Sequence, residues 1–262
     1  MWGLIENNMP KLTKYTITSN RLPEEFKGYK IAQVSDLHNA EVGKDNEKVL
    51  KILRSANPDI ILLTGDLIDS RKTDLAVAVS FAKKAHQIAP CYYASGNHES
   101  RLEDFDSFAK QLEDVGVTVL KNQKIRLQIE SEYITLMGIE DPAFTNEYPS
   151  DLDASYMEQT IEDIKAQDDG FTVVLSHRPE LLDVYFKCDL DVVFSGHAHG
   201  GQFILPLIGG LFAPGQGFFP KYTQGVICKN NTSVVISRGV GNSSFPFRLN
   251  NPPEVVLVEL QK

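Results

Sequence analysis

The stretch IILLTGD occupies residues 60–66 and decides the fold class of this chain. Its four consecutive apolar residues are typical of a strand buried on both faces of a parallel sheet, because a half-exposed strand alternates polar and apolar side chains. Apolar residues at helical spacing lie on either side of it, at residues 46–56 and 75–88. A buried strand between two helices predicts an α/β domain.

The alternation of strands and helices continues outward from this stretch. Between residues 118 and 137, three short, partly alternating runs predict a meander of strands at 118–120, 125–129 and 133–137. This mixture predicts a four-layer αββα sandwich, in which two mixed β-sheets are flanked by helices. The other expected strands are 31–34, 91–94, 171–175, 192–194, 234–236 and 255–258, and the other expected helices are 102–115, 156–166 and 179–186.

The domain organisation is expected to be simple, because the 262 residues contain no repeat and no low-complexity linker. We expect a tail at residues 1–11 and a single domain at residues 12–262. The start, Met1–Ile5, is apolar but too short for a signal peptide or a membrane span, so it could be the remnant of a membrane anchor or a native start. As given, the chain is expected to be soluble.

The charge and the cysteines exclude several classes of protein. A net charge of −9 argues against stable binding to the nucleic-acid backbone, which needs a basic surface. It leaves a phosphate substrate open, since bound metal ions can supply positive charge. Three widely spaced cysteines form neither a disulfide framework nor a thiolate zinc site.

Polar side chains follow five of the expected strands, at the point where each strand ends. Because the carboxyl ends of parallel strands open onto the ligand crevice, we expect these side chains to share one site. Five of the six histidines lie in these positions, which a scatter of structural histidines would not produce. The residues concerned are Asp36, His38, Asp66, Asn97, His98, His177, His197 and His199.

The side chains in this set favour a particular metal chemistry. Carboxylate, amide and imidazole groups without cysteine suit Mn, Fe, Zn, Co or Ni. There are too many candidates for one tetrahedral ion, whereas two ions that share a bridging carboxylate would use them. Two metals about 3.5–4 Å apart form a clamp for in-line displacement at phosphorus. The expected reaction is therefore metal-assisted hydrolysis of a phosphoester.

Taken in order, these motifs resemble the calcineurin-like metallophosphoesterases over residues 30–200. The motifs are Asp36-x-His38, Gly65-Asp66-x-x-Asp69, Gly96-Asn97-His98-Glu99, His177 and Gly196-His197-x-His199. The stretch GHAHGGQ at residues 196–202 is similar to a bacterial, membrane-associated branch that includes relatives of UDP-diacylglucosamine hydrolases. That branch commonly carries an N-terminal membrane anchor, so the location stays open between the cytoplasm and a membrane face.

The resemblance implies a role for each motif residue. Asp36, His38 and His199 would hold one metal, Asn97, His177 and His197 would hold a second, and Asp66 would bridge the two. His98 would act near the scissile phosphate as leaving-group acid or charge stabiliser, and Asp69 would orient it. The metals would be two divalent ions, Mn, Fe or Zn, with Mn favoured by the resemblance.

The activity expected from residues and resemblance together is hydrolysis of a phosphodiester or pyrophosphate by in-line attack of a metal-bridging hydroxide. The substrate would be a phosphate ester, which could be lipid-linked or a nucleotide. Two alternatives stay open. One is a phosphomonoesterase or protein phosphatase, and the other is a non-catalytic, metal-stabilised binding scaffold of the same fold.

Other residues carry two interpretations each. Asn39 and Arg178 could bind the phosphate, or they could be an ordinary turn residue and a surface arginine. Glu99 could contact the site, although an acid in the first turn of a helix is common, and we favour that structural interpretation. The apolar segment at residues 203–219 could fold over the core as a Gly/Pro-rich loop, which we favour, or form a rim that contacts a membrane.

Overall fold

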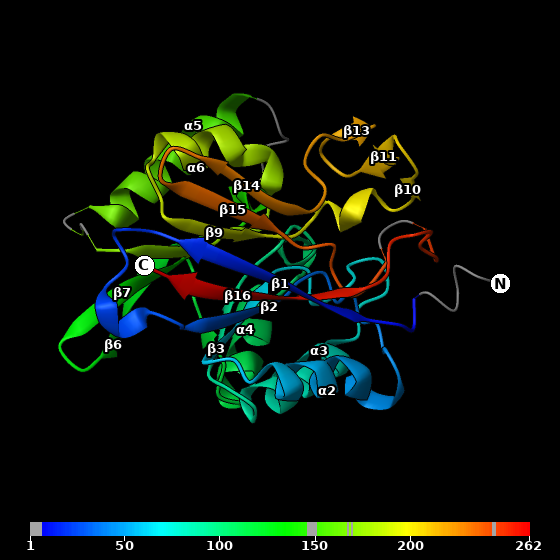
Figure 1. Cartoon of the computed structure of the whole chain (residues 1–262). Helices are drawn as coiled ribbons and strands as arrows, with labels where there is room; N and C mark the ends of the chain where they lie inside the picture. The colour runs from blue at the N-terminus through cyan, green and yellow to red at the C-terminus, as the bar shows by residue number, and fades with distance from the viewer. Residues whose placement is uncertain (1–6, 146–150, 167, 169, 243–244) are drawn as a thin grey trace.

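Two six-stranded sheets stack face to face at the centre of the molecule (Figure 1). The computed structural model describes residues 7–145, 151–166, 168, 170–242 and 245–262. The anchor remnant considered for Met1–Ile5 lies outside these residues. Helices cover the outer faces of both sheets, so the predicted four-layer αββα sandwich is confirmed.

The first sheet has the order β1-β16-β2-β3-β4-β5. β16 runs antiparallel to β2, and all other neighbours in this sheet are parallel. The carboxyl ends of β2, β3 and β4 therefore lie at the same edge. The strand bounds are β1 Lys11–Thr18, β16 Glu254–Gln261, β2 Lys30–Val34, β3 Ile60–Thr64, β4 Cys91–Ala94 and β5 Thr118–Val119.

The second sheet has the order β14-β15-β9-β8-β7-β6. Its four central strands are parallel, and the two outer strands pair antiparallel with their neighbours. β8 and β9 end beside the loops that follow β3 and β2, as the contact of His177 with Thr64 and the hydrogen bond from the His197 amide to the Asp36 carboxylate show. The bounds are β14 Gly225–Lys229, β15 Thr232–Ile236, β9 Val192–Ser195, β8 Thr172–Leu175, β7 Glu132–Gly138 and β6 Gln123–Ile129.

Five α-helices form the outer layers of the described structure. α2 (Glu47–Ala56), α3 (Leu75–His86) and α4 (Phe105–Asp114) pack on the first sheet, and α5 (Asp151–Lys165) and α6 (Leu182–Lys187) pack on the second. Among the described residues, none of the helices has both the length and the apolar character that crossing a bilayer requires. Short 3-10 helices lie at η1 Glu24–Phe26, η2 Lys44–Asn46, η3 Glu99–Arg101, η4 Pro142–Thr145, η5 Pro179–Leu181 and η6 His199–Gly201.

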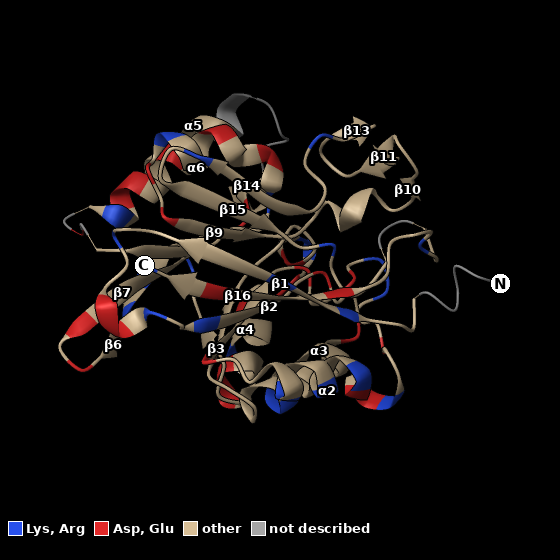
Figure 2. Ribbon diagram, in the orientation of Figure 1, with Lys and Arg blue, Asp and Glu red and all other residues tan. Residues whose placement is uncertain are grey.

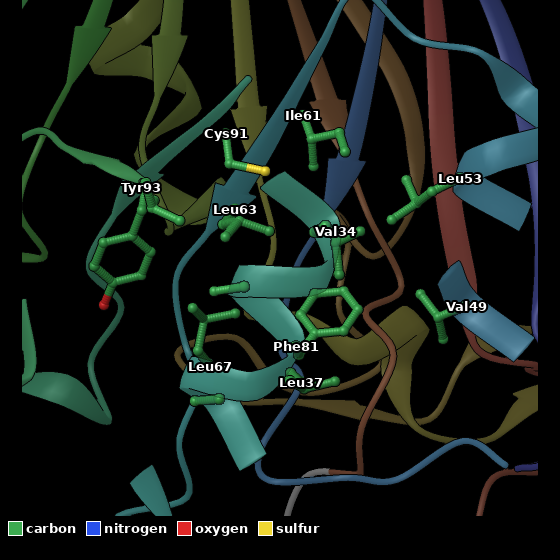
Figure 3. Packing of buried hydrophobic residues seen from close by; sticks show 14 of the residues in the cluster. Val34, Leu37, Val49, Leu53, Ile61, Leu63, Leu67, Phe81, Cys91 and Tyr93 are labelled. Carbon is green, nitrogen blue, oxygen red and sulfur yellow. The ribbon is translucent and has the colours of Figure 1, made fainter. Parts of the chain in front are cut away.

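Successive residues of the central strands enter different cores, because side chains alternate across a sheet. Ile61 and Leu63 of β3 face the helices, where Phe81 of α3 packs (Figure 3), whereas Ile60 and Leu62 fill the space between the two sheets. Most of the strand ribbon is free of charged residues, which lie mainly on helices and loops (Figure 2). The apolar run at residues 60–63 thus has both faces buried, as its sequence predicts.

The predicted meander is wrong in one part. β6 and β7 form an antiparallel hairpin of the second sheet, but β5 pairs parallel with β4 in the first sheet. The chain leaves the first sheet after residue 119 and enters the second at residue 123, and three short runs in the sequence do not reveal such a change. The strands β1 and β14 were not predicted.

The favoured interpretation of residues 203–219, a loop folded over the core, holds for only part of the segment, in which Ala213 is buried in the core of the second sheet. This segment forms two short hairpins, and the side chains of Leu207, Ile208, Phe218 and Phe219 are exposed, with Leu207 fully so. The tips of the hairpins stand away from the end of the second sheet in Figure 1. Their bounds are β10 Ile204–Leu205, β11 Gly209–Gly210, β12 Phe212–Ala213 and β13 Gly217–Phe218.

Candidate metal centre

The loops after β2, β3, β4, β8 and β9 bring the candidate ligands together at one edge of the sandwich. Three groups of side chains have their ligand atoms within 4.8 Å of one another. The first group is Asp36, His38 and His199, the second is Asp66, His177 and His197, and a third, His38, Asp66 and His98, connects these two. The first and the second group each draw on both sheets, which explains why residues more than a hundred positions apart in the sequence meet here.

In the first group the ligand atoms face one another at short distances. His199 Nε2 lies 3.3 Å from Asp36 Oδ1, and His38 Nε2 lies 3.2 Å from His199 Nε2. His38 Nε2 is also 3.6 Å from Asp66 Oδ2, which connects this group to the second one. Three buried side chains whose ligand atoms point at the same space fit the donor set of a divalent cation.

In the second group a backbone carbonyl fixes the orientation of the imidazole. His177 Nδ1 donates to the Thr64 carbonyl oxygen at 2.8 Å, and its Nε2 points to Asp66 Oδ2 at 3.2 Å. Asn97 is buried, and its Oδ1 accepts no hydrogen bond from any described residue. An orphaned amide oxygen beside an imidazole and a carboxylate also fits a cation.

The pKa shifts follow from burying these groups together. Burial lowers the pKa of His38 to about 3 and lowers those of His197 and His199 well below the ordinary value, so these three imidazoles are neutral at pH 7, the form in which an imidazole can bind a metal. Burial raises the pKa of Asp36 to about 6. Burial also lowers the pKa of His177, but the Asp66 and Asp36 carboxylates outweigh this and raise it well above the ordinary value. Positive charge is therefore stabilised at the point where Asp66 and His177 meet.

The backbone around the ligands is held in an uncommon conformation. Five candidate ligands have positive φ, which costs on the order of 1 kcal/mol for a residue other than glycine. Such strain persists only where the surrounding structure enforces it, and it is common at functional sites. The residues are Asp36 (φ 52°), His38 (47°), Asp66 (52°), His197 (62°) and His199 (47°).

Two glycines are required by the close approach of these loops. A Cβ on Gly96 would clash with Asp66 Oδ1, and a Cβ on Gly196 would clash with Asp36 Oδ2. Neither place has room for any side chain. The glycines of the two motifs therefore allow the carboxylates of the two ligand groups to pack against neighbouring backbone.

Glu99 connects the loop after β3 to the loop after β4. It is fully buried and accepts hydrogen bonds from the backbone amides of Gly96 at 2.8 Å, Asp66 at 2.9 Å and Leu67 at 2.8 Å. The interpretation of Glu99 as a structural acid is thus supported by its contacts, but its partners belong to the site. Burial and the nearby Asp66 raise its pKa to about 7.

The C-terminal part of the chain supports the loops that carry Asp36 and His199. The sequence analysis did not indicate this support. Asn251 is buried and donates through Nδ2 to the His199 carbonyl at 2.7 Å and to the Gln202 carbonyl at 3.1 Å. The amide of Gly241 donates to the Asp36 carbonyl at 2.6 Å. A single asparagine in a loop forms no motif, so nothing in the sequence marks this role.

His98 lies beside the first group, with its ring 4.5 Å from that of His38. The Ser70 amide donates to His98 Nδ1 at 3.0 Å, which leaves the proton of the neutral ring on Nε2. Asp69 Oδ1 is 3.5 Å from the same nitrogen, but both Asp69 oxygens accept hydrogen bonds from Arg71, at 2.9 and 2.7 Å. Burial lowers the pKa of His98. The orienting role of Asp69 stays a prediction.

The two predicted phosphate-binding residues have partners within the protein. Asn39 Nδ2 donates to the Lys72 carbonyl at 2.7 Å. Arg178 forms a two-pronged pair with the buried Asp141, with Nε and Nη2 each 2.8 Å from a carboxylate oxygen. Neither residue lines the pocket described next, and their role in binding stays a prediction.

A pocket of about 160 Å³ opens over these side chains. Four candidate ligands and His98 form its floor, and Pro214, next to β12, forms part of its rim. Two arginines line it that the sequence analysis did not single out. The lining residues are Asp66, Arg71, Asn97, His98, Arg101, His197, His199 and Pro214.

An αββα sandwich with imidazole and carboxylate ligands at its strand ends points to the class of metal-dependent phosphoesterases. The family model for the calcineurin-like phosphoesterases matches residues 29–201, and the chain belongs to this family. The family uses divalent metals and hydrolyses phosphate esters. The matched region contains both ligand groups and ends before the C-terminal part that holds Asn251.

Individual relatives agree with this assignment. The uncharacterized metallophosphoesterase YkuE of Bacillus subtilis (strain 168) is 27% identical over 98% of this chain and 87% of its own length. The phosphodiesterase YaeI of Escherichia coli (strain K12) is 28% identical over 78% of this chain and 70% of its own length. The structure of TT1561 of Thermus thermophilus has the same fold, with a TM-score of 0.57 at 12% identity over 82% of this chain and 91% of that one.

Proposed function

We propose that this protein is a binuclear metal-dependent phosphoesterase that hydrolyses a phosphodiester or pyrophosphate bond. The observation that carries the proposal is the pair of ligand groups, Asp36-His38-His199 and Asp66-His177-His197, joined through Asp66 at the floor of one pocket. The name of the relative YaeI, a phosphodiesterase, supports a diester substrate.

The proposed ligand assignment follows the two groups. Asp36, His38 and His199 hold one ion, while His177 and His197 hold the other together with Asn97. Asp66 lies within reach of both, as its distances to His177 and His38 indicate. Two divalent cations, for which we propose manganese, would neutralise the phosphate oxygens. They would also lower the pKa of a water molecule for in-line attack.

The protein's own groups prepare the departure of the leaving group. The Ser70 amide holds His98 as the tautomer with its proton on Nε2. This nitrogen can pass its proton to the oxygen that leaves phosphorus, or donate a hydrogen bond to it as charge develops. Asp66 Oδ1 accepts from the His98 amide at 2.8 Å, which fixes the backbone of His98 to the ligand group.

Hydrolysis of bis(p-nitrophenyl) phosphate by protein purified with its own metals tests the proposal. We expect turnover that a chelator removes and that added Mn²⁺ restores, and a lower rate on the monoester p-nitrophenyl phosphate. Asp66→Asn, which keeps the volume of the side chain, should remove activity while circular dichroism stays unchanged. A protein that holds two metals but hydrolyses neither compound would support a binding scaffold instead.

We also propose that the hairpins at residues 203–219 contact a membrane surface, as in the membrane-associated branch that the sequence resembles. Leu207, Ile208, Phe218 and Phe219 are exposed around the tips, and Pro214 between them reaches the pocket. Exposed apolar side chains at one place favour insertion into the interfacial region of a bilayer. A lipid-linked substrate could then enter from the membrane side.

Sedimentation with vesicles of a zwitterionic lipid tests this second proposal. The wild-type protein should sediment with the vesicles, and the double variant Leu207→Ser/Phe218→Ser should stay in the supernatant. Tyr156→Ser is the matched control, because it removes another exposed apolar side chain from a different face. Equal sedimentation of all three proteins would contradict the proposal.

A further inference from the structure

The pocket has one basic wall, formed by Arg71 and Arg101. Arg71 lies in the loop between β3 and α3, and Arg101 ends the short helix η3, three residues beyond His98. Both are exposed, in a chain whose net charge is −9. Two guanidinium groups on the same side of one small pocket make that side a favourable place for an anion despite the overall charge.

The position of this wall relative to His98 is defined by Ser70. Arg101 Nη1 lies 3.4 Å from Ser70 Oγ, and the same hydroxyl lies 3.1 Å from His98 Nδ1. Ser70 therefore connects Arg101 to the Nδ1 side of the His98 ring. The double hydrogen bond from Arg71 to Asp69 orients its guanidinium at the same wall.

Arg101 differs from the other basic side chains around the site. Arg178 is paired with the buried Asp141, and Arg71 is paired with Asp69. Arg101 has no ion-pair partner among the described residues, although it borders the pocket. A planar guanidinium of this kind is suited to bind a phosphate through two parallel hydrogen bonds.

We propose that Arg101, with Arg71 beside it, forms a subsite for a second phosphate, located on the leaving group of the substrate. This inference rests on the proposed function, in which the leaving group departs past His98. It narrows the substrate to the pyrophosphate class or to diesters whose leaving group carries its own phosphate. A phosphate bound at Arg101 would be next to the bond that breaks.

The reaction of a pyrophosphate diester balances with these groups. The oxygen of water forms a bond to one phosphorus, the bond from this phosphorus to the bridging oxygen breaks, and that oxygen leaves with the second phosphorus. Two phosphomonoesters form, and the protons of water are released to the solvent or through His98. The charge that appears on the departing phosphate is what Arg101 and Arg71 would stabilise.

A binding experiment with the metal-loaded protein tests the subsite without any turnover. Calorimetry would compare methylenediphosphonate, which carries two phosphonates, with methylphosphonate, which carries one, and metal content would be measured before and after. We expect Arg101→Gln to weaken the binding of the bisphosphonate about tenfold, because one charge-assisted contact is lost. The affinity for the monophosphonate should change less than about twofold. Arg54→Gln, on the distant helix α2, should change neither.

Equal effects of Arg101→Gln on both ligands, or no effect on either, would overturn the subsite. Arg101→Lys should recover part of the difference, because it keeps the charge but loses the planar fork. The kinetic counterpart compares a dinucleoside pyrophosphate with a dinucleoside monophosphate, and Arg101→Gln should lower kcat/KM for the first only.

These outcomes separate the subsite from the proposed function. If the protein hydrolyses neither compound but still discriminates the bisphosphonate through Arg101, the proposed function fails and the subsite stands. If it hydrolyses both compounds and Arg101→Gln affects them equally, the function stands and the subsite fails.

Discussion

The two ligand groups of the centre are held by different parts of the chain. The loops of Asp66 and Asn97 are connected from within their own motifs, where Glu99 accepts from three backbone amides at 2.8 to 2.9 Å. The loops of Asp36 and His199 are in addition held from outside their motifs, by Asn251 and Gly241, which both lie in the segment between β15 and β16. The Asp66 half of the site therefore has its support within its own motifs, whereas the Asp36 half depends in part on the C-terminal part of the chain.

This difference teaches where changes in the chain should be tolerated. The support of the Asp66 half lies inside the region that the family model matches, whereas Asn251 lies beyond residue 201. Changes in the C-terminal part should weaken the Asp36 half selectively. The following predictions separate the two halves, and they run from the largest expected effect to the smallest.

Asp66→Ala should break both halves at once. The variant loses the carboxylate that faces His177 and His38, so we expect diesterase kcat/KM to fall by about a thousandfold or more and both metals to bind poorly. Steady-state kinetics and elemental analysis measure these effects. A variant that keeps two ions and a tenth of the activity would show that Asp66 does not connect the two ligand groups.

Glu99→Gln should break the Asp66 half. The amide places an N–H₂ group where a carboxylate oxygen now accepts from backbone amides, which leaves at least one buried donor unpaired at a cost of about 1–3 kcal/mol. Unfolding by urea of the metal-free protein measures this loss. The exposed Glu103→Gln is the control and should leave the free energy of unfolding unchanged.

Asn251→Ala should loosen only the Asp36 half. The variant removes the side-chain donor that the carbonyls of His199 and Gln202 share, and among the described residues the His199 carbonyl keeps only the Gln202 amide. Such support of a ligand is typically worth about 10- to 100-fold in metal affinity. Titration with metal should therefore show one site weakened and the other unchanged. Asn250→Ala, at an exposed position next to it, should show two normal sites. Equal weakening of both sites would mean that the halves are not supported separately.

Phe219→Ser should affect neither half. The side chain is 63% exposed on the hairpins, and surface substitutions usually change stability by less than about 0.5 kcal/mol. Activity on a soluble diester should stay within error of the wild-type value. A loss of activity on this substrate would place the hairpins in the active site itself.

The sequence predicted the sandwich and the meeting of the ligands, because both depend on strong local patterns. Apolar runs such as residues 60–63 mark strands buried on both faces, and polar residues at their ends follow the geometry of parallel sheets. The edge strand β1 was missed because most of its side chains are exposed or half-buried and alternate weakly. The place of β5 in the first sheet was not predicted, because a strand of two residues shows no periodicity.

The supports of the site were harder to predict, because they depend on backbone groups. The Ser70 amide that holds His98 has no side-chain signal, and Asn251 contacts carbonyl oxygens far away in the sequence. The exposure of Phe218 and Phe219 depends on the direction in which the hairpins leave the sheet. The sequence favoured a loop folded over the core for that segment, and only the exposed tips of the hairpins depart from it.

The central claim is that two cations lie between the ligand groups, and anomalous diffraction from crystals of the protein purified with its own metals tests it most directly. We predict two peaks, one next to Asp36 and His199 and the other next to His177, with Asp66 beside both. Elemental analysis of the same sample should give two ions per chain. A single peak, or two peaks away from these side chains in a folded protein, would contradict the account.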